Sequence, residues 1–168
     1  MMATDSNETV KNVVFDVGRV LIDFNYGDFF ALLNRHGAEI STEADFVARA
    51  GLQEYEQGRL SSSQFLARLQ GLLQEPLPKK ELEAAWIGLF SPVPEMLELA
   101  AELKSVCGVF LLSNTSELHW QHLQSAYALN ACCHDLLASY EIGALKPEPA
   151  IYQTLAKRFG LVPATTLF

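Results

Sequence analysis

The sequence predicts an α/β fold in which a parallel sheet core carries a helical insert after its first strand. Three observations lead to this prediction. Residues 12–16 form a short β-branched run, NVVFD, which is bounded by Gly18 and is typical of a buried strand. Residues 26–90 carry helical periodicity with almost no strand signal. From residue 91 onward, strand-like and helical segments alternate, and this alternation favours a parallel sheet.

The helical insert contains four expected helices. Their segments are GDFFALLNRHG at 27–37, STEADFVARAG at 41–51, SSSQFLARLQGLL at 61–73 and KKELEAAWIGLF at 79–90. The third helix opens with a capping box made by Ser61 and Gln64. Its apolar residues fall on one helical face: Phe65, Leu66, Leu69, Leu72 and Leu73. The block is therefore expected to be a helical insert after the first strand.

After the insert, three helices alternate with three strands. The expected helices are PEMLELAAELKS at 94–105, SELHWQHLQSAY at 116–127 and PEPAIYQTLAKRFG at 147–160. The first carries Pro94 in its first turn, and the last is closed by Gly160. The expected strands are GVFLLSN at 108–114, HDLLAS at 134–139 and ATTLF at 164–168. This divides the chain into a core at residues 1–25 and 91–168 and a cap at residues 26–90.

Polar residues stand at the ends of two expected strands. Asp16 ends the first, and Ser113 and Asn114 end the second. In parallel α/β sheets, ligands bind beyond the carboxyl ends of the strands, so these side chains are expected in one crevice. Asp16 could be a covalent nucleophile or a turn cap, and Ser113 a phosphate ligand or a helix cap. Lys146 precedes a proline in a loop, where it could neutralise phosphate charge or be solvated surface.

Composition excludes several functional classes. The chain has 168 residues and a formal net charge of -8, with no Lys/Arg cluster beyond two adjacent pairs, so a nucleic-acid partner is not expected. No apolar run approaches the ~20 residues that span a bilayer, and the polar N-terminus does not resemble a signal peptide. The three cysteines are an odd number, which favours reduced thiols and a cytoplasmic location.

Three segments taken together resemble the haloacid dehalogenase-like hydrolase superfamily. VVFDVGRVLIDF resembles its first motif, LLSNTSELH its second and YEIGALKPEPAIYQ its third, in the same order and with similar spacing. The resemblance extends from about residue 12 to the end and implies a Rossmann-like core with a small helical cap. Within the superfamily, the first motif is most similar to bacterial sugar-phosphate phosphatases of the alpha-D-glucose-1-phosphate phosphatase type.

The resemblance also assigns roles to the residues at the strand ends. Asp16 would attack phosphorus and form an aspartyl-phosphate, while Ser113 and Lys146 would bind the phosphoryl group and Asn114 would help to orient it. Mg²⁺ would be held by the Asp16 carboxylate, the backbone carbonyl of Gly18 and the phosphate. The implied activity is Mg²⁺-dependent hydrolysis of a small sugar phosphate.

Two departures from the family pattern accompany this resemblance. Gly18 stands where phosphatase members usually have an acid/base aspartate, so we expect a preference for easy leaving groups such as anomeric phosphates. The acidic pair of the fourth motif is not found, so a third acidic metal ligand is absent from the chain. We therefore expect an incomplete C-terminal part of the core, an exposed sheet edge that could support self-association, and a chain that could be inactive.

Two alternative functions follow from the same residues. Haloacid dehalogenases use the same aspartate nucleophile without Mg²⁺, but their first motif usually carries an aromatic residue at the position of Gly18. A non-catalytic binding or regulatory module of the same fold is the other alternative, and the absent fourth motif favours it.

Overall fold

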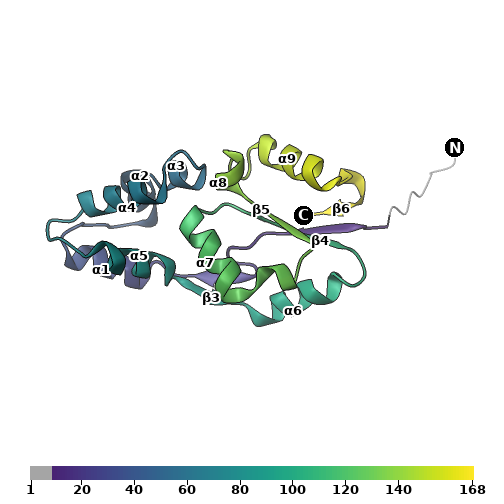
Figure 1. The fold of residues 1–168 in the computed structure, drawn as a ribbon, viewed down its shortest axis with the longest axis horizontal. Helices are drawn as coiled ribbons and strands as arrows, with labels where there is room; N and C mark the ends of the chain where they lie inside the picture. The colour runs from purple at the N-terminus through teal and green to yellow at the C-terminus, as the bar shows by residue number, and fades with distance from the viewer. Residues whose placement is uncertain (1–8) are drawn as a thin grey trace.

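A four-stranded parallel sheet forms the centre of the molecule, as shown by a computed structural model that describes residues 9–168 (Figure 1). The strand order is β5-β4-β1-β6. The strands are β1 (Asn12–Phe15), β4 (Gly108–Ser113), β5 (Asp135–Ala138) and β6 (Thr166–Leu167). The predicted α/β fold with a parallel core is therefore confirmed. Residues 1–8 of the predicted core segment, with most of the polar N-terminus, lie outside the described part of the chain.

The pairing register aligns the carboxyl ends of the central strands. Phe15 of β1 pairs with Leu111 of β4, and Ser113 of β4 pairs with Ala138 of β5. The carboxyl ends of β1, β4 and β5 therefore lie together at the same end of the sheet. β6 pairs with β1 from Asn12↔Thr166 to Val13↔Leu167 and lies at the edge of the sheet. Self-association through a sheet edge stays a prediction.

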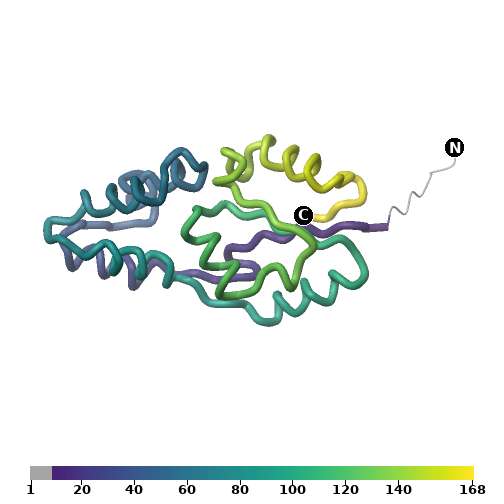
Figure 2. Tube along the Cα trace, viewed as in Figure 1, coloured from purple at the N-terminus to yellow at the C-terminus, as the bar shows by residue number. Residues whose placement is uncertain are grey.

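Helices cover both faces of the sheet (Figures 1 and 2). They are α6 (Pro94–Leu103), α7 (Glu117–Tyr127), α8 (Ser139–Ile142) and α9 (Pro149–Phe159). Side chains alternate along β4, so that Val109 and Leu111 pack in one apolar cluster with α6 and α7, whereas Leu112 packs in a second cluster with α9. This burial on both faces is what a parallel sheet requires.

Five helices between β2 and β3 form a separate lobe, drawn at the left of Figure 1. They are α1 (Gly27–Arg35), α2 (Glu43–Ala50), α3 (Leu52–Glu56), α4 (Ser62–Gly71) and α5 (Lys79–Ile87). The lobe has its own cluster of buried residues, with Trp86 and Phe46 fully buried at its centre. The predicted capping box of Ser61 and Gln64 opens α4. The separate cluster supports the predicted division into core and cap, which itself stays a prediction.

A short antiparallel ribbon joins the cap to the core. β2 (Ile22–Phe24) leads into the cap and β3 (Phe90–Pro92) leads out of it, with Phe24 opposite Phe90. We did not expect a strand pair within these segments, because three-residue strands carry no readable alternation. The ribbon therefore holds the segment that enters the cap beside the segment that leaves it.

A second contact between cap and core lies at the turn after α3. The Ser139 hydroxyl lies 2.6 Å from the Glu56 carbonyl oxygen and accepts a hydrogen bond from the Thr115 amide. Gly58 has a φ of +67°, and a Cβ added there would lie 2.2 Å from the Tyr140 carbonyl oxygen. Only glycine permits this approach of two backbones. The turn is therefore fixed against the start of α8.

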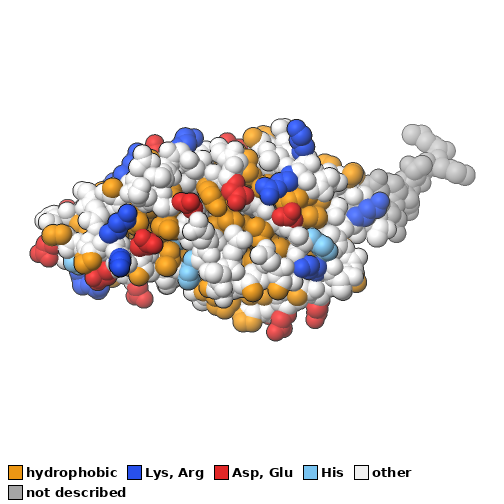
Figure 3. Space-filling model, in the orientation of Figure 1, with side chains coloured by type: hydrophobic (Ala, Val, Ile, Leu, Met, Phe, Trp, Pro, Cys, Tyr) orange, Lys and Arg blue, Asp and Glu red, His pale blue; other side chains and the backbone are white. Residues whose placement is uncertain are grey.

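The helices of residues 9–168 are all too short or too polar to cross a membrane. The face drawn in Figure 3 mixes acidic and basic side chains and shows no continuous basic patch.

Candidate active site

Asp16 and Lys146 form an ion pair where β1 ends. The Asp16 Oδ1 atom lies 2.6 Å from the Lys146 Nζ atom and accepts a second hydrogen bond from the Val17 amide at 2.7 Å. The lysine side chain is 13% exposed and the aspartate side chain 40% exposed. Both interactions fall on one carboxylate oxygen, so the other oxygen, Oδ2, is left for a ligand or reactant.

Asn114 holds the loop that carries Lys146. Its side-chain oxygen accepts a hydrogen bond from the Lys146 amide at 2.7 Å, and its side-chain nitrogen donates to the Lys146 carbonyl at 3.1 Å. The Lys146 ammonium also donates to the Leu112 carbonyl at 3.0 Å. Asn114 thus binds the lysine loop on both sides, which fixes the ammonium at the end of the sheet.

Ser113 lies deeper than the other predicted residues. Its side chain is 3% exposed, and its hydroxyl has one weak contact, 3.4 Å from the Asn114 carbonyl. It lines a small inner recess of about 50 Å³ with Gly18, Glu56 and Asn114. Its predicted role as a phosphate ligand stays a prediction.

Gly18 lies in a tight loop that follows Asp16. The Ile22 amide donates to the Val17 carbonyl at 2.9 Å, and the Arg19 amide donates to the Ile22 carbonyl at 2.7 Å. This pattern leaves the Gly18 carbonyl without a backbone partner among residues 9–168. The Arg19 guanidinium lies over the Phe24 ring, 4.5 Å from its centre, instead of pairing with Asp23.

These residues open onto a cleft of about 310 Å³ between core and cap. The core contributes Asp16, Gly18, Arg19, Asn114 and Lys146, and the cap and its entrance contribute Phe24, Tyr26, Glu43, Val47, Leu52, Gln53 and Glu56. The structure therefore brings Asp16, Gly18, Asn114 and Lys146 together in one cleft, with Ser113 in the adjoining recess.

Glu56 is a cap carboxyl group in this cleft whose acidity is strongly altered. Its carboxyl pKa is raised to about 7, mainly by burial and then by the negative charge of Glu43, while the Lys146 ammonium partly opposes the shift. Burial and the nearby carboxylates likewise raise the pKa of the Tyr26 hydroxyl. No motif pointed to Glu56, although perturbed carboxyl groups in clefts are frequent at functional sites.

The buried His119 lies behind the inner recess. Its Nε2 atom lies 3.0 Å from the Trp86 carbonyl oxygen, and its ring stacks on the Trp86 indole at 4.0 Å between centres. Burial lowers its pKa to about 3, so the imidazole is neutral at pH 7. The neutral imidazole is therefore part of the packing behind the recess.

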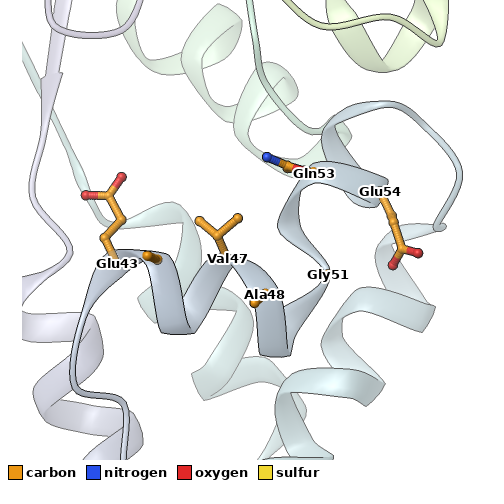
Figure 4. A pocket seen from close by; sticks show the side chains of 7 residues that line it. Glu43, Val47, Ala48, Gly51, Gln53 and Glu54 are labelled. Carbon is orange, nitrogen blue, oxygen red and sulfur yellow. The ribbon is translucent and has the colours of Figure 1, made fainter.

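A second, larger open pocket lies along α2 and α3 of the cap (Figure 4). It is lined by Glu43, Val47, Ala48, Gly51, Gln53 and Glu54, with Ala44. Figure 4 shows Glu54 projecting from α3 away from Gln53. None of its lining residues comes from the strand ends, but Glu43, Val47 and Gln53 also line the cleft between core and cap.

The donor set fits a magnesium ion only in part. Mg²⁺ is commonly bound through one or two carboxylates together with substrate oxygens and water. The Asp16 carboxylate and the unpartnered Gly18 carbonyl supply oxygens of the required type. Within residues 9–168, no cluster of three or more His, Cys, Asp or Glu side chains is placed to bind a metal.

Comparison with known proteins identifies the family of this chain. The family profile of haloacid dehalogenase-like hydrolases matches residues 10–168. The chain belongs to this family of hydrolases, as the three motifs predicted.

One relative shows similarity to this chain at the level of an individual enzyme. The chain is 32% identical to a D-ribitol-5-phosphate phosphatase of Bacteroides thetaiotaomicron, over 95% of this chain and 82% of that protein. The predicted enzyme class is confirmed by the hydrolase family together with this phosphatase relative. The finer resemblance to alpha-D-glucose-1-phosphate phosphatases stays a prediction.

Solved structures confirm the fold. A haloacid dehalogenase (HAD) family enzyme of Bacteroides thetaiotaomicron superposes with a TM-score of 0.84 at 24% identity, covering 94% of this chain and 82% of that one. The same enzyme has been solved as a magnesium complex, with a TM-score of 0.81, 25% identity and coverage of 94% and 81%.

Proposed function

We propose that this protein is a Mg²⁺-dependent phosphomonoester hydrolase that acts on a small phosphorylated sugar or polyol through an aspartyl-phosphate. The observation that carries the proposal is the pairing of Asp16 with Lys146 at the end of β1, in a cleft closed by the cap. The phosphatase relative and the magnesium complex of a family member support it.

The proposed chemistry needs little from the protein beyond positioning and charge. Asp16 attacks phosphorus through Oδ2, because Oδ1 is engaged by Lys146 and the Val17 amide. Lys146 neutralises the charge on the equatorial phosphoryl oxygens, and Asn114 keeps the lysine loop in place. Phosphoryl transfer is accelerated mainly by such preorganised electrostatics.

The metal would be held by Asp16 and the Gly18 carbonyl, with substrate oxygens completing its coordination. When bound, Mg²⁺ reduces the repulsion between the anionic nucleophile and the anionic phosphate. Among residues 9–168, one carboxylate and one backbone carbonyl are placed to hold it.

The size and charge of the cleft support a small phosphorylated substrate. Its volume of about 310 Å³ lies at the lower end of the range for small-molecule sites, ~300–1,000 Å³. Phe24 and Val47 offer apolar contacts, while Gln53 and Arg19 offer donors for hydroxyl groups. The three cysteines are free thiols, which is compatible with the predicted cytoplasmic location.

Phosphate release tests the proposal directly. The panel contains D-ribitol 5-phosphate, glucose 1-phosphate, glucose 6-phosphate and 4-nitrophenyl phosphate, each measured with Mg²⁺ and with EDTA. We expect Mg²⁺-dependent release that Asp16→Asn abolishes.

Two outcomes would contradict the proposal. Absence of phosphate release from the whole panel favours the non-catalytic module of the same fold. Halide release from 2-chloropropionate without Mg²⁺ favours the dehalogenase alternative.

A further inference from the structure

The cleft contains a carboxylate that the proposed chemistry has not used. Phosphate ester hydrolysis by a nucleophilic aspartate needs a proton for the departing alkoxide. Gly18 cannot supply it, because it has no side chain. Of the other ionisable groups on the cleft wall, Lys146 is ion-paired and Glu43 is exposed to solvent. The Arg19 guanidinium lies over the Phe24 ring, and burial raises the pKa of the Tyr26 hydroxyl above its ordinary value. Glu56 remains, and it lines both the cleft and the inner recess beside Gly18.

The backbone of Glu56 is anchored to the core rather than to the cap alone. Its carbonyl oxygen lies 2.6 Å from the hydroxyl of Ser139, which is fully buried at the end of β5. The next residue, Gln57, donates to the Glu148 carboxylate at 3.1 Å, and Gly58 packs on the Tyr140 carbonyl. These contacts hold Glu56 at a fixed place over the strand ends.

The Glu56 carboxylate itself has no such anchor. None of the hydrogen bonds or ion pairs within residues 9–168 involves its side-chain oxygens, whereas Glu54 on the same helix is paired with Arg68. A partly buried carboxylate that faces a cleft and has no partner is free to exchange a proton with a ligand.

We propose that Glu56 is the general acid and base of this enzyme, supplied by the cap in place of a side chain at Gly18. This inference rests on the proposed phosphatase function. In the first step, a bond forms between Asp16 Oδ2 and phosphorus while the bond from phosphorus to the ester oxygen breaks. The electron pair of that bond goes to the departing oxygen, which takes the Glu56 proton and leaves as an alcohol.

The second step reverses the proton's path. Water attacks phosphorus of the aspartyl-phosphate, and the Glu56 carboxylate takes one proton from that water. The bond between phosphorus and Asp16 breaks, so inorganic phosphate leaves, the Asp16 carboxylate is restored and Glu56 is protonated again. One carboxyl group thus serves both steps, and each cycle ends with the starting protonation.

The surrounding charges suit this exchange. The charged groups that face Glu56 are Glu43 on α2 and Lys146 on the core, and Tyr26 lies nearby at the start of the cap. Because the Glu56 pKa lies at about 7, both of its forms are populated near neutral pH. A catalytic acid and base is most effective when its pKa is close to the working pH.

Leaving-group dependence tests the assignment. The probes are the primary alkyl phosphate turned over fastest in the panel and 4-nitrophenyl phosphate, whose phenolate leaves without protonation. For Glu56→Gln, we expect kcat/KM to fall by about 10²–10⁴-fold with the alkyl phosphate and by less than about threefold with 4-nitrophenyl phosphate. The decline of kcat/KM above about pH 7 should also disappear in this variant with the alkyl phosphate.

Two variants serve as controls. Glu54→Gln, on the outer side of the same helix, should leave both substrates unchanged. Glu43→Gln removes a charge that raises the Glu56 pKa, so the alkaline decline should move to lower pH while the leaving-group difference persists.

Equal losses with both substrates, or no loss with either, would overturn the assignment and leave the phosphatase proposal intact. A parent protein that releases phosphate from neither substrate would overturn both. A strong preference of the parent for anomeric phosphates, as expected from Gly18 alone, would also contradict a proton donor on the cap.

Discussion

The strand ends of the core and the turn after α3 in the cap build the same cleft by different means. At the strand ends, Asp16, Asn114 and Lys146 are bound to one another by ion pair and hydrogen bonds. At the cap turn, Glu56 has a fixed backbone and a free carboxylate. The core thus presents a preorganised charge, whereas the cap presents a group that can change its protonation.

This difference separates two tasks of catalysis. A nucleophile and its counter-ion gain from being held rigidly, since their charges must not rearrange during the reaction. An acid and base instead needs a pKa near the working pH, and partial burial next to another carboxylate provides it. We therefore expect substitutions at the strand ends to stop the reaction, and substitutions at the cap turn to change its dependence on substrate and pH.

The largest effect is expected for the nucleophile. Asp16→Asn should lower kcat by at least about 10⁴-fold with every substrate, as loss of a covalent nucleophile typically does. Steady-state phosphate release measures it. The matched control is Asp135→Asn, which changes an exposed carboxylate at the opposite end of β5, a strand that β4 separates from β1. A near-normal rate in the Asp16 variant would remove the residue from the mechanism.

A smaller effect is expected for the counter-ion. Lys146→Ala should lower kcat/KM by about 10²–10³-fold, similarly for alkyl and aryl phosphates, because the lost charge acts on the phosphoryl group and not on the leaving group. Lys146→Arg should not restore the rate fully, since a planar guanidinium does not replace a point charge. Lys157→Ala, on the exposed last turn of α9, is the control. A change of less than threefold would show that Lys146 does not act on the phosphoryl group.

Packing of the cap turn against the core should affect the free energy of unfolding more than the reaction rate. Gly58→Ala places a Cβ 2.2 Å from the Tyr140 carbonyl at a positive φ, which should lower the free energy of unfolding by about 1–3 kcal/mol. Urea unfolding measures the change. Gly71→Ala is the control, because a Cβ at Gly71 meets no atom within 4 Å and alanine favours helix. Equal stability of the two variants would show that the cap turn does not rest on the core.

A loss of stability of similar size is expected for the hydroxyl beneath Glu56. Ser139→Ala leaves the Glu56 carbonyl and the Thr115 amide without this partner and should cost about 1–3 kcal/mol of stability. It should also reduce kcat/KM for alkyl phosphates more than for 4-nitrophenyl phosphate, because the acid is displaced and the nucleophile is not. Ser105→Ala, at an exposed helix end, is the control. An equal reduction for both substrates would contradict this positioning role.

The sequence predicts the residues at the strand ends because each of them falls within a recognisable local sequence pattern. Asp16 and Asn114 each follow an apolar run, and Lys146 precedes a proline, so their spacing carries the motif. Glu56 lies on a five-residue helix that no periodicity reveals, and its acidity depends on Glu43 and on burial by the core. The same reason explains why β2 and β3 were not expected: such short elements form through tertiary contacts rather than local propensity.

The most direct test of this account is a rapid-quench measurement on the Glu56→Gln variant with 4-nitrophenyl phosphate and Mg²⁺. The aryl group leaves without an acid, but the aspartyl-phosphate then lacks the base that activates water. The account predicts a burst of nitrophenolate equivalent to about one per enzyme, followed by slow turnover, with phosphate found on Asp16 by peptide mass spectrometry. Turnover at the parent rate without a burst, with Asp16 unmodified, would contradict it.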